Sequence, residues 1–186
     1  MAGWIGFAVL PWYGLDREGL LSLGWLENYP DARSAPGLLQ SIAYGKAWLL
    51  LLGCALALPV AALTIPRERD AYGRLVLLSG ILGLVIAGVT GFGIGNNGPR
   101  WGWLAALAGD ARQIGMGIGA AVTMVAFVML IADGLAARGY FRGDAFLSGA
   151  LTLIIAMIGL FVAYPVVGVL TSAFLDPDGN LAPERF

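Results

Sequence analysis

The sequence predicts an all-α fold: a polytopic integral membrane helix bundle with four long transmembrane helices and a short N-terminal apolar segment. Hydrophobic residues make up 59% of the 186-residue chain, and the mean hydropathy is +0.80. Charged residues make up 12%, about half the share that is usual in soluble proteins. Residues 146–174 carry no charge at all. As a helix they would reach roughly 43 Å, which exceeds the hydrocarbon core of a bilayer, about 30 Å thick.

Composition also excludes several classes of function. The net charge of −1 is unlike the basic surface that nucleic-acid binding requires, so we expect no nucleic-acid partner. The chain has no histidine, which removes histidine-ligated haem, His-carboxylate metal sites and His-dependent acid–base catalysis. The single cysteine, Cys54, cannot form a disulfide within the chain. Because the sequence also offers no nucleophile–base pair, phosphate loop or metal cluster, we expect no enzyme, no catalytic residues, no cofactor and no metal.

The first 45 residues are expected to form a short apolar segment and an interfacial outer loop. Residues 1–13 are apolar but too short to span a bilayer as a helix. Two interpretations remain open: a half-buried segment, or the far end of a membrane helix that starts upstream. Residues 10–13 are typical of a helix end at the membrane interface, because proline breaks helices and Trp and Tyr favour headgroup depth. Residues 14–44 resemble a loop or short amphipathic helix on the membrane face, with a helix start at Ser34 and Pro36.

Four long apolar spans follow, at about residues 46–65, 75–95, 113–132 and 146–174. We group the first three as a membrane extension over residues 46–145, and the last with the tail over residues 146–186. Pro59 and Pro165 lie inside the first and fourth spans, where the missing backbone donor of a proline usually kinks a helix. In lipid such a kink requires other groups to satisfy the freed carbonyl.

The arginines of the short loops predict the orientation of the bundle. Basic residues concentrate in cytoplasmic loops. One short loop of this chain carries Arg67, Arg69 and Arg74, and another carries Arg138 and Arg142. We therefore expect both loops in the cytoplasm and the C-terminal tail outside. The tryptophans agree, because this orientation brings the following residues to the outer interface: Trp12, Trp25, Trp48, Trp101 and Trp103. Asp133 is interpreted as a solvated helix end, with an ion-coupling acid as the alternative.

Small residues recur every four positions in two of the spans. They are Ser79, Gly83, Ala87, Gly91 and Gly95 in the second span, and Gly115, Gly119 and Thr123 in the third. This spacing lets helix backbones approach closely in lipid, and we expect an intramolecular contact, with a dimer face or a ligand groove as alternatives. Residues 93–98 match G-x-G-x-x-G, but a dinucleotide site needs a preceding strand. A helix C-cap and turn explain them better.

The last part of the chain resembles a known transporter family. Residues 161–186, FVAYPVVGVLTSAFLDPDGNLAPERF, resemble the first core helix and outer loop of a binding-protein-dependent ABC importer permease. Four upstream segments resemble the N-terminal membrane extension of ferric iron permeases: LPWYGL at 10–15, LLQ at 38–40, RQIGMGIG at 112–119 and RGYFRGDAF at 138–146. The resemblance implies a multi-pass protein of the bacterial inner (plasma) membrane that carries ferric iron. It also implies three protein partners: the remainder of the permease, a cytoplasmic ATP-binding subunit and an extracytoplasmic solute-binding protein.

The chain departs from a working permease of this family in one respect. It contains no Glu-Ala-Ala…Gly loop, which in the family receives the ATPase. We therefore expect these residues not to transport by themselves. The alternative is a free-standing small integral membrane protein that acts as an assembly or partner-binding subunit. A membrane enzyme or redox subunit is the weakest hypothesis, because ligands and catalytic pairs are absent from the sequence.

Overall fold

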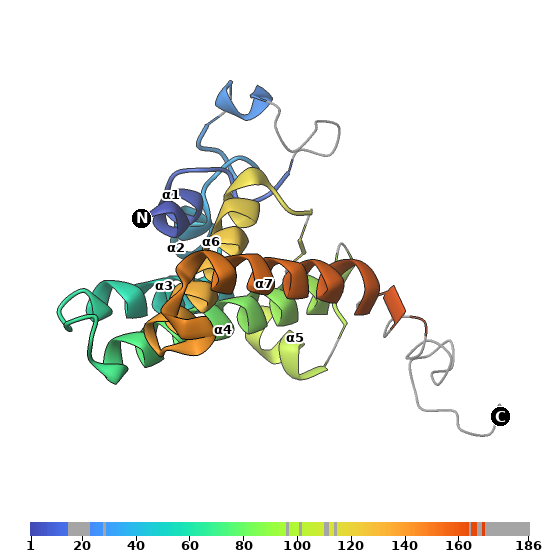
Figure 1. Cartoon of the computed structure of the whole chain (residues 1–186). Coiled ribbons are helices and arrows are strands. Elements are labelled where there is room, and N and C mark those ends of the chain that lie inside the picture. Colours follow the sequence, from blue (N-terminus) through green and yellow to red (C-terminus); the bar gives the residue numbers. More distant parts are fainter. Residues whose placement is uncertain are drawn as a thin grey trace.

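The computed structural model describes residues 1–14, 23–27, 29–95, 97–100, 102–109, 112–113, 115–163, 165–166 and 169. Two helices, α4 (Asp70–Gly93) and α6 (Ile118–Ala137), pack against each other at the centre of the fold (Figure 1). Helix α7 (Ala145–Ile158) packs on α6 and continues as a π-helical turn, η4 (Gly159–Ala163). By length and composition, α4, α6 and the segment Ala145–Ala163 are each able to cross a membrane. The predicted all-α membrane class is confirmed at the level of these three helices.

The first predicted long span is a shorter helix. Helix α3 (Leu50–Ala62) follows a 3-10 turn, η2 (Ala47–Leu49), and the apolar helical segment Ala47–Ala62 falls below the length of the other three. The structure therefore does not show the fourth long transmembrane helix that residues 46–65 predicted. The chain beyond it turns sharply, with Leu63 capping the helix and backbone turns running to Ile65.

Local chemistry explains why α4 and α6 begin at different residues from those predicted. Helix α4 begins at Asp70 rather than residue 75. The Asp70 carboxylate pairs with Arg74 one turn later, and its negative charge at the N-terminus interacts favourably with the helix dipole. Helix α6 begins at Ile118 rather than residue 113. Gly115 has φ of +103° and Gly117 is extended, so neither continues a helix.

Pro59 lies inside α3, and neighbouring elements satisfy the backbone around it. Proline has no N–H to donate to the carbonyl four residues earlier, that of Ala55. The Ser79 hydroxyl of α4 donates to this carbonyl over 2.7 Å. One residue further on, the Trp4 indole N–H donates to the carbonyl of Leu56 over 3.1 Å. Side chains from two other helices thus stabilise the proline-containing segment.

The start of α7 is defined by a side-chain cap, and its end by a change in helix type. The Asp144 carboxylate accepts hydrogen bonds from the backbone N–H groups of Phe146 and Leu147. The π-helical turn η4 ends two residues before Pro165, the residue at which the sequence predicted a kink. A proline removes the regular donor, and a π turn is one way in which a helix absorbs that loss. The predicted continuation over residues 170–174 and the outer tail lie outside the described residues.

The N-terminal region forms a small cap at one end of the bundle. Helix α1 (Ala2–Ala8) packs against α3 and α6, and α2 (Gly37–Ile42) packs beside it. Helix α1 is about 10 Å long, and Gly3, Gly6 and Phe7 on it are buried. A 3-10 turn, η1 (Gly24–Leu26), lies in the loop between α1 and α2. Isolated bridges join Pro11 to Pro36 and Tyr13 to Met116.

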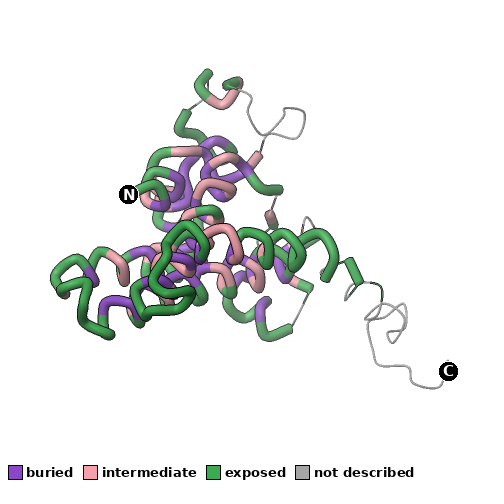
Figure 2. The backbone as a smooth tube through the Cα atoms, in the orientation of Figure 1, coloured by how far each residue is buried: buried purple, intermediate pink, exposed green. Residues whose placement is uncertain are grey.

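Burial is concentrated where α1, α3, α4 and α6 meet, whereas α7 is largely exposed (Figure 2). Trp12 and Trp48 belong to this core, where their rings pack among Phe7 and other apolar groups. Trp103 is exposed and Trp25 is half-buried, whereas Trp101 lies outside the described residues.

The segment between α4 and α6 contains a tight hairpin and a short helix. Strands β1 (Ile94–Gly95) and β2 (Gly98–Pro99) pair antiparallel directly after α4. The G-x-G-x-x-G match therefore sits on a helix end and turn rather than on a strand-to-helix junction. Helix α5 (Gly102–Ala108) follows, and the 3-10 turn η3 (Tyr140–Gly143) joins α6 to α7.

Candidate functional site

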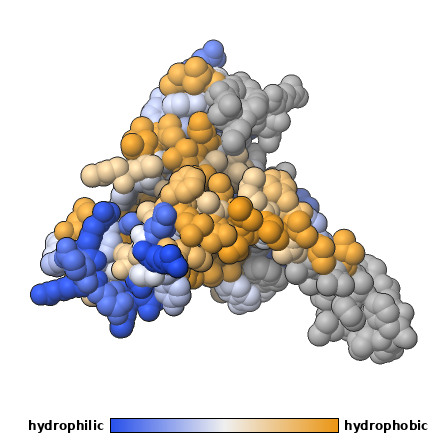
Figure 3. All heavy atoms as spheres, viewed as in Figure 1, coloured by the Kyte–Doolittle hydropathy of each residue, from blue (hydrophilic) through white to orange (hydrophobic). Residues whose placement is uncertain are grey.

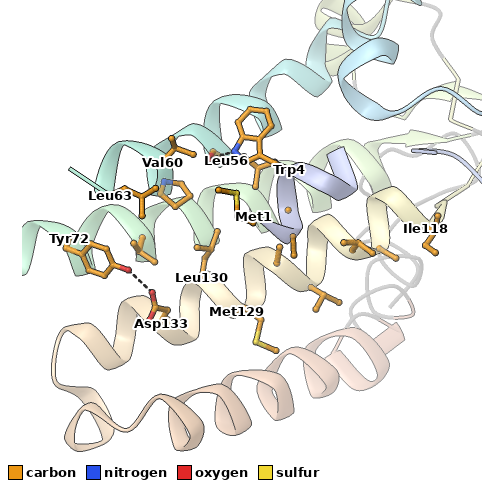
Figure 4. A pocket seen from close by; sticks show the side chains of 18 residues that line it. Met1, Trp4, Leu56, Val60, Leu63, Tyr72, Ile118, Met129, Leu130 and Asp133 are labelled. Carbon is orange, nitrogen blue, oxygen red and sulfur yellow. Dashed lines mark hydrogen bonds between the residues drawn. The ribbon is translucent and has the colours of Figure 1, made fainter. Parts of the chain in front are cut away.

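The described structure has an elongated apolar groove with a volume of about 770 Å³ between α1, α3, α4 and α6 (Figure 4). Helix α6 lines it along one continuous face. The α6 residues are Ile118, Ala121, Val122, Val125, Ala126, Met129, Leu130 and Asp133, and they recur at the three- and four-residue spacing of one helix side. From Ile118 to Asp133 this face is about 22 Å long.

The groove exists because α1 is much shorter than the helix it packs on. Helix α1 has 7 residues and α6 has 20, or about 10 Å against about 30 Å. The two run antiparallel, with Gly6 against Thr123 and Gly3 against Ala126. A Cβ atom at Gly6 would lie 2.6 Å from Thr123 Oγ1, so only a glycine permits this approach. Past Gly3, the groove continues along α6 toward Asp133.

One end of the groove carries its polar side chains. The Tyr72 hydroxyl donates to Asp133 Oδ2 over 3.0 Å (Figure 4). Arg67 Nε donates to the same hydroxyl over 3.3 Å, and its guanidinium lies 3.9 Å from Asp133 Oδ1. The hydrogen bond with Tyr72 raises the pKa of Arg67 above its ordinary value. Arg67 is 75% exposed, so its charge is available at the mouth of the groove.

Three of the five predicted topology arginines form ion pairs in the structure. Asp70 pairs with Arg74 and, over 3.4 Å, with Arg138 from the other loop. Together with Arg67 these residues join the loops that follow α3 and α6. Among the described residues Arg69 and Arg142 have no ion pair. Hydrophilic side chains gather at this end of the molecule, while α7 presents a hydrophobic surface (Figure 3).

A second polar group lies near η2, at the N-terminal cap. The Lys46 ammonium sits 3.7 Å from the centre of the Tyr13 ring, a cation–π contact. Burial lowers the pKa of Lys46 to about 8 and raises that of Tyr13 well above its ordinary value. Three buried polar atoms nearby in the described structure have no hydrogen-bond partner: Tyr13 Oη, Gln40 Oε1 and Trp48 Nε1. The sequence did not indicate that these groups come together.

The predicted packing residues divide into those that make helix contacts and those that do not. Ser79 and Ala87 are buried, and Gly83 lies directly against the Phe127 ring of α6. Gly119 packs on α1, where a Cβ would lie 2.6 Å from the carbonyl oxygen of Gly6. Thr123, buried beside it, donates to the Gly119 carbonyl.

For three glycines, the structure does not show the helix contact that the sequence predicted. A Cβ at Gly91 would meet nothing within 4 Å, because this part of α4 faces away from its neighbours. Gly95 lies in β1, after the end of α4. Gly115 precedes α6 and likewise has open space around it, and its φ of +103° assigns it a turning role.

The groove itself was not predicted, although part of the signal was present in the sequence. The apolar face of α6 follows from periodicity, but its lack of a full-length partner follows from the place of α1, about 120 residues away. The contact between Tyr72 and Asp133 joins positions 61 residues apart and has no local sequence signal. Within the described residues, no three His, Cys, Asp or Glu side chains are grouped as metal ligands would be.

No family model matches the chain, and no similar curated protein or solved structure was found.

Proposed function

We propose that this chain is a membrane-spanning part of an ABC-type importer permease whose cargo is ferric iron. The observation that carries the proposal is the order of the sequence segments that resemble this family, which extends from residue 10 to residue 186. Three helices of membrane-spanning length and composition suit such a role. The chain would lie in the bacterial inner membrane, with the arginine-rich loops in the cytoplasm and the C-terminal tail outside.

Helix α7 has an exposed apolar surface that suits this role. In the proposal it is the first core helix, and the remainder of the permease packs against it. Its buried positions are Ser148 and Thr152, and Ser148 Oγ donates to the Ala132 carbonyl of α6 over 2.8 Å. Large apolar side chains elsewhere on the helix are exposed, Ile155 at 67% among them. Such a face fits either lipid or further helices, and the permease proposal assigns it to further helices.

The remaining partners follow from the same resemblance. A cytoplasmic ATP-binding subunit would supply the energy, and an extracytoplasmic solute-binding protein would deliver the iron. Because the 186 residues contain no loop of the kind that receives the ATPase, the contact with that subunit would be made by the remainder of the permease.

Uptake of radiolabelled ferric iron tests the proposal in the bacterium that makes the protein. In-frame deletion of the coding sequence should reduce uptake under iron limitation to background, and the wild-type sequence should restore it. Ile155→Trp should fail to restore uptake, because it enlarges the α7 face assigned to further helices. Val85→Trp, on an exposed part of α4, should restore it. Unchanged uptake after the deletion would overturn the proposal and favour a free-standing membrane subunit.

A further inference from the structure

The groove along α6 has the dimensions of a site for a single extended chain. Its α6 face is about 22 Å long, while half of a hydrocarbon core measures about 15 Å. An acyl chain that enters from one leaflet would therefore fit along its length. Val125 and Met129 line the groove and are about half exposed, so the groove is open on its side as well as at its end. Lipid can enter without any rearrangement of the helices.

The lining excludes water as the natural occupant of most of the groove. Apart from the polar end, the side chains that line it are apolar, and the Trp4 indole N–H is already engaged with the Leu56 carbonyl. Water is retained in a cavity only where it finds two to four polar partners, and apolar cavities bind apolar molecules instead. A hydrocarbon chain satisfies such a surface, and the membrane around α6 supplies it.

The charge at the polar end selects the headgroup. Arg67 is bound to Tyr72 and lies beside Asp133, both of which line the groove. The two loops at this end carry five arginines, Arg67, Arg69, Arg74, Arg138 and Arg142, against four acids, Glu68, Asp70, Asp133 and Asp144. Since Asp70 is shared by Arg74 and Arg138, the end has a positive excess that attracts anionic lipid.

We propose that this groove binds one anionic phospholipid, with an acyl chain along the α6 face and the phosphate at Arg67. The site requires neither iron nor a transport partner, so it is independent of the permease role. It uses a helix face, a short neighbouring helix and one exposed arginine. Each of the three can be changed separately.

Native mass spectrometry of the purified 186-residue chain tests the proposal, with phosphatidylglycerol and phosphatidylcholine as probes. One phosphatidylglycerol should remain bound, with about fivefold preference over phosphatidylcholine, the effect expected for one arginine near a headgroup. Arg67→Gln should abolish this preference while the acyl chain still binds. Val125→Trp should remove the bound lipid because the indole fills the groove. Val85→Trp is the matched control, since both valines are 55% exposed but Val85 lies outside the groove, and it should retain the lipid.

A second measurement on the unaltered chain keeps the test decisive if Val125→Trp fails to fold. Phosphatidylglycerol with a photoreactive group in its acyl chain should label Val125 or Met129 on α6. Labelling confined to α7 or to the outer face of α4 would overturn the proposal. So would equal lipid retention by Val125→Trp and Val85→Trp, or a lipid-free dimer, which would mean that a second copy fills the groove. Binding of glycerol phosphate as tight as that of the whole lipid would contradict the role of the acyl chain.

Discussion

At the scale of single residues, Pro59 and Ser79 show how a helix-breaking residue is tolerated in an apolar bundle. Pro59 leaves the Ala55 carbonyl without its regular donor, and Ser79 supplies a hydroxyl from the next helix. The sequence indicated both residues, Pro59 as a kink and Ser79 as a small packing residue. It did not indicate that they act together, because the hydrogen bond joins residues 24 positions apart.

We expect Ser79→Ala to destabilise the protein by about 0.5–2 kcal/mol, because the Ala55 carbonyl loses its donor in an apolar setting. In a Pro59→Ala background the loss should be much smaller, since the alanine that replaces the proline has a backbone N–H that can donate to this carbonyl within α3. Unfolding in detergent of the wild type, both single variants and the double variant measures the coupling. Additive effects of the two substitutions would contradict this account.

Lys46 should give the protein a distinctive dependence on alkaline pH. Burial lowers its pKa to about 8 in the folded state from 10.5. Between these values the unfolded chain binds more protons than the folded one, so stability rises with pH. Tyr13, whose pKa burial raises, affects stability mainly from about pH 10 upward, where the tyrosine of the unfolded chain ionises, so the lower part of this window reports Lys46.

We therefore expect the melting temperature of the wild type in detergent to rise from pH 7.5 to 9.5 relative to that of Lys46→Met. The methionine keeps the apolar contact of the side chain with Tyr13 but carries no proton to lose. Thermal melts of both proteins across this range provide the measurement. Parallel pH profiles would show that the Lys46 charge is not desolvated on folding.

At the scale of elements, hydrophobic length predicted three of the long helices but overestimated residues 46–65, and the four-residue spacing predicted helix contacts only in part. A four-residue step turns about 40° past one full turn of an α-helix. From Ser79 to Gly91 the small residues therefore rotate by about 120° around α4. This drift explains why Ser79, Gly83 and Ala87 are buried while Gly91 faces open space. Gly115 was expected inside the third span, but its positive φ places it in the turn before α6, which begins at Ile118.

Gly83→Ala and Gly91→Ala should have opposite effects on stability. A Cβ at Gly83 collides with the Phe127 ring, so we expect a loss of about 1–3 kcal/mol. Gly91 has room for a methyl group, and alanine favours a helix over glycine by roughly 0.5–1 kcal/mol, so its substitution should be neutral or stabilising. Chemical unfolding in one detergent compares the two variants. Equal losses would mean that the helix contact extends along all of α4.

At the scale of the whole molecule, the side of the membrane on which each loop lies was predicted from the arginines alone. Asp70 and Arg138 bring the two arginine-bearing loops together at one end of the bundle, as loops on a common side require. The fold class followed from composition. The groove and the Tyr72–Asp133 contact could not be predicted, because they depend on tertiary packing between residues distant in the sequence.

Cysteine labelling from outside intact cells tests the orientation. In a Cys54→Ala background, cysteines at Ala71 and Ala145 should resist a membrane-impermeant maleimide, because both positions lie in or beside the loops that we predict to be cytoplasmic. A cysteine at Asn97, in the turn between β1 and β2, should react. Labelling after permeabilisation shows that the protected cysteines are reactive. The reverse pattern would invert the topology.

The docking of α1 on α6 has a consequence for biogenesis. Thr123 and Gly3, which meet across this contact, are separated by 120 residues. A ribosome adds about 5–20 residues per second, so α1 waits for several seconds at least before its main partner exists. During that interval it can associate with α3, its other neighbour, or with the membrane surface. The packing of α1 on α6 is therefore a late event in membrane insertion, although α1 is made well before α6.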